Sequence, residues 1–143
     1  MHHPPRVLVV EDSATLAFTY RAILSQNGYS VTTAETRDAG LAELQSQSFD
    51  ILLCDLTLDH GHSGLEVIAF ARGRCPQLPV ALLTGYDDVE IRMAAAQLGV
   101  SVLAKPIGVG QLLVSVQWML GTVEQERSQI PERLAKGAST SAA

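Results

Sequence analysis

One short run of residues constrains the fold of this chain more than any other feature. Residues 51–56 read Ile-Leu-Leu-Cys-Asp-Leu, so four apolar residues lead directly into a carboxylate. A continuous apolar run of this length is typical of a strand that is buried on both faces of a parallel sheet. Asp55 is then expected at the carboxyl end of that strand, where open α/β sheets bind their ligands. An aspartate after a strand is also common as a turn residue or helix cap, so a functional role needs partners from elsewhere in the chain.

The rest of the chain alternates between apolar runs and helical periodicity. Strands are predicted at residues 6–10, 29–33, 49–54, 80–83 and 100–104. Helices are predicted from the cap Ser13 to Asn27-Gly28, and at residues 36–47, 64–74, 87–98 and 109 to roughly 125. Five strand–helix repeats imply right-handed crossovers and a parallel sheet with helices on both faces. We therefore expect one doubly wound α/β domain.

Composition excludes several classes of protein. The chain has 143 residues, a net charge of −5 and a pI of about 5.2, which argues against non-specific binding to nucleic acid. No apolar run approaches the ~18 residues of a membrane span, and the first residues lack a signal-peptide core. We expect a cytoplasmic protein with reduced cysteines, in which Cys54 is a small core residue.

Polar residues that suit phosphoryl chemistry follow four of the five predicted strands. These residues are Glu11, Asp12, Asp55, Thr84 and Lys105. In a doubly wound sheet the strand ends converge on one crevice. Three carboxylates in one pocket repel each other and stay ionised only when a cation offsets their charge. Mg²⁺ (or Mn²⁺) binds such oxygen ligands, so a divalent metal site is expected here.

A carboxylate next to a metal ion can act as a nucleophile toward phosphorus. Phosphoryl transfer mainly requires positioning and neutralisation of the phosphoryl oxygens. The metal ion, the ammonium of Lys105 and the hydroxyl of Thr84 would each contact one of the three oxygens. Gly85 has no side chain and would leave room for the incoming group. The sequence therefore predicts that Asp55 accepts a phosphoryl group.

These motifs together resemble those of response-regulator receiver domains of two-component signalling. The matching stretches are residues 7–13 (Val-Leu-Val-Val-Glu-Asp-Ser), 53–56 (Leu-Cys-Asp-Leu), 82–85 (Leu-Leu-Thr-Gly) and 104–106 (Ala-Lys-Pro). Each is weak alone, but four in this order at strand ends are specific. The resemblance implies a flavodoxin-like sheet of order 2-1-3-4-5 with five helices. We expect a receiver domain at residues 6–126, with flexible termini at 1–5 and 127–143, since the end of the chain is small and polar.

The resemblance also implies a role for each site residue. Asp55 would accept phosphate from a phosphohistidine, and Asp12, Asp55 and the main-chain carbonyl of Thr57 would ligate Mg²⁺. Glu11 would hold the ion through water. Receivers are not enzymes beyond intrinsic phosphotransfer and autodephosphorylation.

Thr84 would move toward the phosphate and Lys105 would pair with it, with a cis bond before Pro106. The implied partners are a sensor histidine kinase or phosphotransfer protein and an unknown downstream protein. The output surface would be the fourth helix, fifth strand and fifth helix, through which a homodimer is one option. Neither nucleic acid nor membrane is expected as a partner.

The sequence departs from the common receiver pattern at three places. The loop after Asp55 is one residue longer, and Asp59 stands where most receivers have proline. Val102 stands three residues before Lys105, where the family carries an aromatic switch residue. The departure at Val102 means that a phosphorylation-independent binding module is also compatible with the sequence.

The sequence does not decide whether the chain acts alone. It is either a stand-alone receiver, with too few residues after the last helix for an output domain, or the receiver of a hybrid kinase or longer regulator. An aspartyl-phosphate hydrolase would need a carboxylate where Thr57 stands. His60 and His62, beside Asp59, could bind a transition metal, although loop histidines are more often solvated. Tyr20 and Trp118 stand at helical spacing with aliphatic residues, which favours core or helix–helix packing for both.

Overall fold

The computed structural model of the chain describes residues 3–86 and 88–121. Its centre is a parallel five-stranded sheet of order β2-β1-β3-β4-β5, which confirms the predicted order. The strands are β1 (Arg6–Val10), β2 (Ser30–Ala34), β3 (Ile51–Asp55), β4 (Val80–Thr84) and β5 (Ser101–Ala104). The most apolar strands, β1, β3 and β4, occupy the middle of the sheet, as expected for runs that are buried on both faces.

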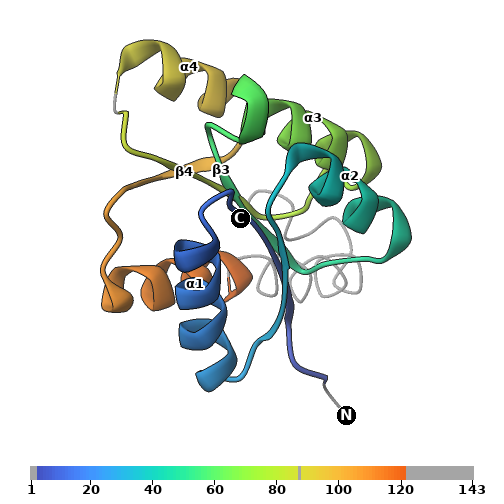
Figure 1. Cartoon of the computed structure of the whole chain (residues 1–143), viewed down its shortest axis with the longest axis vertical. Coiled ribbons are helices and arrows are strands. Elements are labelled where there is room, and N and C mark those ends of the chain that lie inside the picture. The colour runs from blue at the N-terminus through green and yellow to red at the C-terminus, as the bar shows by residue number, and fades with distance from the viewer. Residues whose placement is uncertain (1–2, 87, 122–143) are drawn as a thin grey trace, which may run out of the picture.

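The helices form a layer on each side of the sheet. They are α1 (Ala14–Gln26), α2 (Arg37–Ser46), α3 (Gly64–Arg74), α4 (Val89–Leu98) and a last helix at residues 109–121, with a 3₁₀ turn, η1 (Asp59–Gly61), before α3. In Figure 1, α1 and the orange last helix cover one face, and α2, α3 and α4 cover the other. Among the described helices, none combines the length and apolarity needed to cross a membrane.

Two hydrophobic cores result from the alternation of side chains along the central strands. Val7, Val9, Ile51 and Leu53 pack against α1 and the last helix, whereas Leu8, Val10, Leu52 and Cys54 pack against α2 and α3. All these side chains are fully buried. Burying one Leu or Ile contributes about 1.5–3 kcal/mol. Cys54 is a core residue, as predicted.

Several predicted boundaries differ from the structure because capping residues lie outside the helices they cap. Thr36 and Asp88 accept hydrogen bonds from the N–H groups of the residues three positions later, so α2 begins at Arg37 and α4 at Val89. The strands predicted at 29–33 and 49–54 lie at 30–34 and 51–55. The predicted end of the last helix near residue 125 and both terminal segments fall largely outside the described residues.

The prediction for one aromatic residue was wrong. Tyr20 is buried against the sheet, but the Trp118 side chain is exposed. The last helix places Leu112, Val116 and Met119 on the sheet. A residue two positions after Val116 therefore points away from that face, because successive helical residues are rotated by about 100°.

Arg72 on α3 ties the far end of α4 to the rest of the fold. Its guanidinium donates to the backbone carbonyls of Leu98 (2.8 Å) and Gly99 (2.7 Å) at the end of α4, and to that of Leu78 before β4. Carbonyls at a helix end lack partners inside the helix, and one side chain satisfies them here.

Candidate functional site

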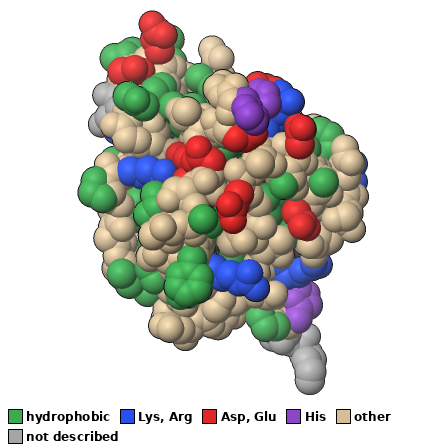
Figure 2. All heavy atoms as spheres, in the orientation of Figure 1, with side chains coloured by type: hydrophobic (Ala, Val, Ile, Leu, Met, Phe, Trp, Pro, Cys, Tyr) green, Lys and Arg blue, Asp and Glu red, His purple; other side chains and the backbone are tan. Residues whose placement is uncertain are grey.

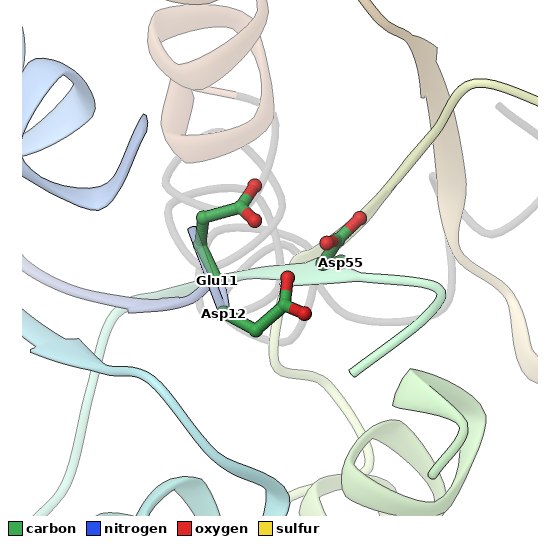
Figure 3. A group of neighbouring side chains, drawn as sticks. All are labelled: Glu11, Asp12 and Asp55. Atoms are coloured by element: carbon green, nitrogen blue, oxygen red, sulfur yellow. The ribbon is translucent and has the colours of Figure 1, made fainter. Parts of the chain in front are cut away.

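The carboxyl ends of β1 and β3 bring three carboxylates together. Glu11 and Asp12 follow β1 directly, and Asp55 is the last residue of β3, the strand next to β1. One ligand oxygen from each of the three lies within 4.8 Å of the others. Figure 3 shows the side chains of Glu11, Asp12 and Asp55 around a common space. Glu11 and Asp55 are buried and Asp12 is exposed, so the cluster opens to solvent on the Asp12 side.

Lys105 supplies one positive charge to this cluster. Its Nζ lies 2.7 Å from Glu11 Oε1 and 3.1 Å from Asp55 Oδ1. Lys105 follows β5, and its backbone N–H donates to the Thr84 carbonyl at 2.8 Å. The Lys105–Pro106 bond is cis, as expected. Three carboxylates against one ammonium leave two excess negative charges when all groups are ionised. Figure 2 shows acidic side chains near the centre of this face with a basic side chain beside them.

The pKa values of the two buried carboxylates, Glu11 and Asp55, shift in opposite directions. Burial raises the pKa of Asp55 to about 7, and the neighbouring charge of Glu11 adds to this effect while Lys105 opposes it. Burial also acts on Glu11, but hydrogen bonds from Lys105 and from the Ser13 N–H (3.1 Å) hold its pKa below the ordinary value. Without a metal ion, Asp55 is therefore the member of this buried pair that binds a proton more readily.

The oxygen-rich donor set fits a hard divalent ion such as Mg²⁺, which takes carboxylates, carbonyls and water. The predicted carbonyl ligand, Thr57, lies in the exposed loop after β3. Two backbone bonds flank it, from the Leu58 N–H to His62 O (2.8 Å) and from the Gly64 N–H to Leu56 O (2.6 Å). The carbonyl of Thr57 takes part in neither bond. A divalent cation at the carboxylates would also offset the excess negative charge.

Thr84 is the predicted site residue whose hydroxyl, among the described residues, bonds to the backbone of Tyr86 and not to the carboxylate cluster. It ends β4 and is buried, but its Oγ1 accepts from the Tyr86 N–H (2.9 Å) and donates to the Tyr86 carbonyl (3.2 Å). Among the described residues, no hydrogen bond joins the Thr84 hydroxyl to Asp55. Val102, at the family's aromatic position, is half-buried in β5 and pairs with Leu82.

Sequence reasoning missed the positioning role of Gly64. A Cβ at this residue would lie 1.8 Å from the Asp55 carbonyl oxygen and 3.0 Å from Cys54 Sγ. Only glycine permits this approach, which packs the start of α3 against the backbone of Asp55. The available signal was a glycine at the first position of a predicted helix, a position that does not otherwise favour it.

Comparison with known proteins identifies the family. A family model for the response regulator receiver domain matches residues 7–117. The chain is 37% identical over 108 residues to the alginate biosynthesis transcriptional regulatory protein AlgB of Pseudomonas aeruginosa, covering 75% of this chain and 24% of AlgB. It is 33% identical over 118 residues to the probable transcriptional regulatory protein TcrX of Mycobacterium tuberculosis, covering 82% and 50%.

The structural comparison agrees with the sequence comparison. The crystal structure of a CheY-like response regulator receiver domain protein from Methanospirillum hungatei JF-1 has a TM-score of 0.82 and 27% identity, covering 86% of this chain and 98% of that one. The chain spans about a quarter of AlgB and half of TcrX. With the receiver-domain match over most of its length, the chain belongs to the response regulator receiver domain family of two-component signalling.

Proposed function

We propose that Asp55 accepts a phosphoryl group from the phosphohistidine of a sensor histidine kinase or phosphotransfer protein. The observation that carries this proposal is the contact of Lys105 Nζ with Asp55 Oδ1 at 3.1 Å, beside the carboxylates of Glu11 and Asp12 at the carboxyl end of the sheet. A buried carboxylate between a cation and a metal-binding cluster has what a phosphoryl acceptor needs.

In the transfer step, a carboxylate oxygen of Asp55 attacks phosphorus. A phosphorus–oxygen bond forms while the phosphorus–nitrogen bond of the donor breaks, and the imidazole nitrogen keeps the electron pair. The attacking carboxylate has to be ionised, and in the metal-free protein burial favours its protonated form. A cation at the cluster is therefore part of the proposal, because it would favour the ionised acceptor.

Asp12, Asp55 and the main-chain carbonyl of Thr57 would hold Mg²⁺ (or Mn²⁺), with Glu11 reaching the ion through water. Bound Mg²⁺ supplies positive charge next to the phosphoryl oxygens. Glu11 also keeps Lys105 in place, since Glu11 Oε1 accepts from its ammonium at 2.7 Å. After transfer, Lys105 would pair with a phosphoryl oxygen in place of the Asp55 carboxylate.

Thr84 connects this chemistry to the output surface. Its hydroxyl has to leave the Tyr86 backbone before it can bind a phosphoryl oxygen. That exchange frees the connection between β4 and α4, so α4 would respond first. Because Val102 is not aromatic, we propose that the signal passes mainly through this connection and not through rotation of a side chain on β5.

The downstream partner would bind the surface formed by α4, β5 and the last helix, where a homodimer is also an option. Exposed apolar side chains lie on both helices, namely Val89, Met93, Val114 and Trp118. The relatives AlgB and TcrX are transcriptional regulators that are longer than this chain. A receiver within such a regulator or a hybrid kinase and a receiver that acts alone are both compatible with this proposal.

Phosphorylation from a small donor tests the proposal without knowledge of the kinase. The protein is incubated with acetyl phosphate, with Mg²⁺ or with EDTA, and its intact mass is measured. We expect a gain of one phosphoryl group with Mg²⁺, and no gain with EDTA or in Asp55→Asn. A folded wild-type protein that gains no mass under any condition would overturn the proposal and favour a phosphorylation-independent binding module.

A further inference from the structure

The loop between β3 and α3 carries a second group of metal-ligating side chains, apart from the carboxylate cluster. Asp59 Oδ2 lies 3.8 Å from His62 Nδ1 and 4.0 Å from His60 Nε2. The two imidazole rings are 6.2 Å apart between centroids and inclined by 70°. Two ring nitrogens from different residues thus approach the same carboxylate oxygen. In Figure 2, histidine atoms border acidic and basic atoms where Figure 1 draws the green turn before α3.

The carboxylate of this group is fixed by its surroundings. Asp59 Oδ1 accepts from the Arg37 N–H at 2.9 Å, which leaves Oδ2 for the histidines. This hydrogen bond holds the pKa of Asp59 below its ordinary value, so the group is an ionised ligand at neutral pH. A hydrogen bond that orients a ligand, like the one from the Arg37 N–H to Asp59, is typical of metal sites. The nearby carboxylates of Asp38 and Glu66 bond to the guanidinium of Arg37.

His62 carries the strongest sign that this group binds a ligand. Its Nδ1 is buried and, within the described part of the chain, has no hydrogen-bond partner. A buried polar atom without a partner is destabilising. The backbone of His62 is fixed, because its carbonyl accepts from the Leu58 N–H (2.8 Å) and its N–H donates to the Asp59 carbonyl (2.9 Å), while its side chain is 30% exposed. A cation beside Asp59 Oδ2 would satisfy the orphaned nitrogen.

His60 supplies an adjustable third ligand. Its backbone φ is +53°, an uncommon conformation for a residue with a side chain, and its side chain is 85% exposed. Zn–N and Zn–O bonds of about 2.1 Å give ligand separations of about 3.4 Å in a tetrahedron. The separations of 3.8 and 4.0 Å from Asp59 exceed this value by about 0.6 Å at most. The nitrogens of the two histidines lie more than 4.8 Å from each other, so the exposed His60 ring has to rotate toward His62 before all three ligands can meet at one ion.

We propose that Asp59, His60 and His62 bind a divalent transition-metal ion of the Zn²⁺ type, with water completing the coordination. Imidazole nitrogens favour Zn²⁺, Cu²⁺ and Ni²⁺ over Mg²⁺, which prefers oxygen. This site is therefore chemically distinct from the carboxylate cluster, although both border the loop after β3. It uses Asp59, a residue at which this loop departs from the usual receiver pattern, and it does not depend on phosphorylation of Asp55.

Titration with Zn²⁺ under isothermal calorimetry tests the proposal. The full chain is used with His2 and His3 changed to glutamine, so that the N-terminus does not contribute, and with saturating Mg²⁺ to occupy the carboxylate cluster. We expect one Zn²⁺ per chain, with binding weakened at least ~10-fold in His62→Gln and in His60→Gln. Asp38→Asn is the matched control and should leave the affinity unchanged, because this neighbouring carboxylate pairs with Arg37 and has no ion pair with a histidine among the described residues.

Co²⁺ provides a second readout, because ligand-field bands in the visible spectrum report nitrogen coordination. The bands should appear in the parent protein and disappear in the His60→Gln/His62→Gln double variant. Equal Zn²⁺ affinity in the parent and the double variant would overturn the proposal, as would the absence of a second metal in the parent protein. Circular dichroism of each variant verifies that it is folded.

Discussion

Replacing Asp55 with asparagine should stabilise the metal-free protein while removing the acceptor. The Asp55 residue is only 7% exposed and shares the ammonium of Lys105 with Glu11. Burial raises its pKa from the ordinary 3.8 to about 7. At pH 8 the native state therefore contains a carboxylate that would be easier to ionise in the unfolded chain, whereas asparagine has no charge to bury.

The size of the effect follows from the difference between the folded and unfolded pKa. Each pKa unit corresponds to about 1.4 kcal/mol, so a rise from 3.8 to about 7 corresponds to about 4 kcal/mol at full ionisation. The attraction of Lys105 is already contained in this pKa, because it opposes the effect of burial. We therefore expect Asp55→Asn to be more stable than the wild type by about 4 kcal/mol at pH 8.

The direction in which the folding stability changes with pH tests this reasoning. The native state binds more protons at Asp55 than the unfolded chain between pH 3.8 and about 7, so the wild type loses stability as the pH rises through this window. Asp55→Asn lacks this loss. The two proteins should therefore be closest in stability near pH 4 and should separate toward pH 8.

Urea unfolding in EDTA at pH 5 and pH 8, followed by circular dichroism, measures the difference. Asp38→Asn, whose side chain is 80% exposed, is the control and should change stability by less than ~0.5 kcal/mol at either pH. A variant that is less stable than the wild type at pH 8, or equally shifted at both pH values, would refute the reasoning. Mg²⁺ should reverse the order, because it stabilises the protein that binds it more tightly.

Three further predictions concern the packing and the charge of the site. Gly64→Ala should lower the free energy of unfolding in urea by about 2–3 kcal/mol and slow phosphorylation, because its Cβ would overlap the Asp55 carbonyl. The control Gly73→Ala, which has open space on the same helix, should leave stability unchanged or raise it. Arg72→Met should cost about 2 kcal/mol and speed amide exchange at the end of α4, whereas the exposed Arg74→Met should do neither. Mg²⁺ binding near pH 7 should release protons from Asp55, seen as a calorimetric heat that depends on the buffer; a buffer-independent heat would contradict it.

The sequence was sufficient to predict the sheet because its signals are local and redundant. The run Ile51–Cys54 has no polar residue to expose, which favours a central strand, and residues 7–10 of its neighbour β1 are equally apolar. Strand ends follow from this assignment, which is why Glu11, Asp12 and Asp55 were expected together and are found within 4.8 Å. Their functional roles remain predictions.

Features that depend on side-chain direction were not accessible in the same way. The hydroxyl of Thr84 can bond to a ligand or to a nearby backbone group. The sequence does not show that it bonds to the N–H and the carbonyl of Tyr86. Trp118 was predicted to be buried because it sits among apolar residues, but the face of a helix depends on the exact phase of its packing. The close approach of Gly64 to Asp55 joins two segments whose separation only the folded loop defines.

The most direct test of the central claim is to identify the phosphorylated atom. The protein is phosphorylated with acetyl phosphate and Mg²⁺ and then treated with borohydride, which reduces an aspartyl phosphate to homoserine. Peptide mass analysis then locates the converted residue. The proposed function predicts homoserine at position 55 and nowhere else. Phosphoprotein in which Asp55 stays intact, with the label on another residue, would contradict it.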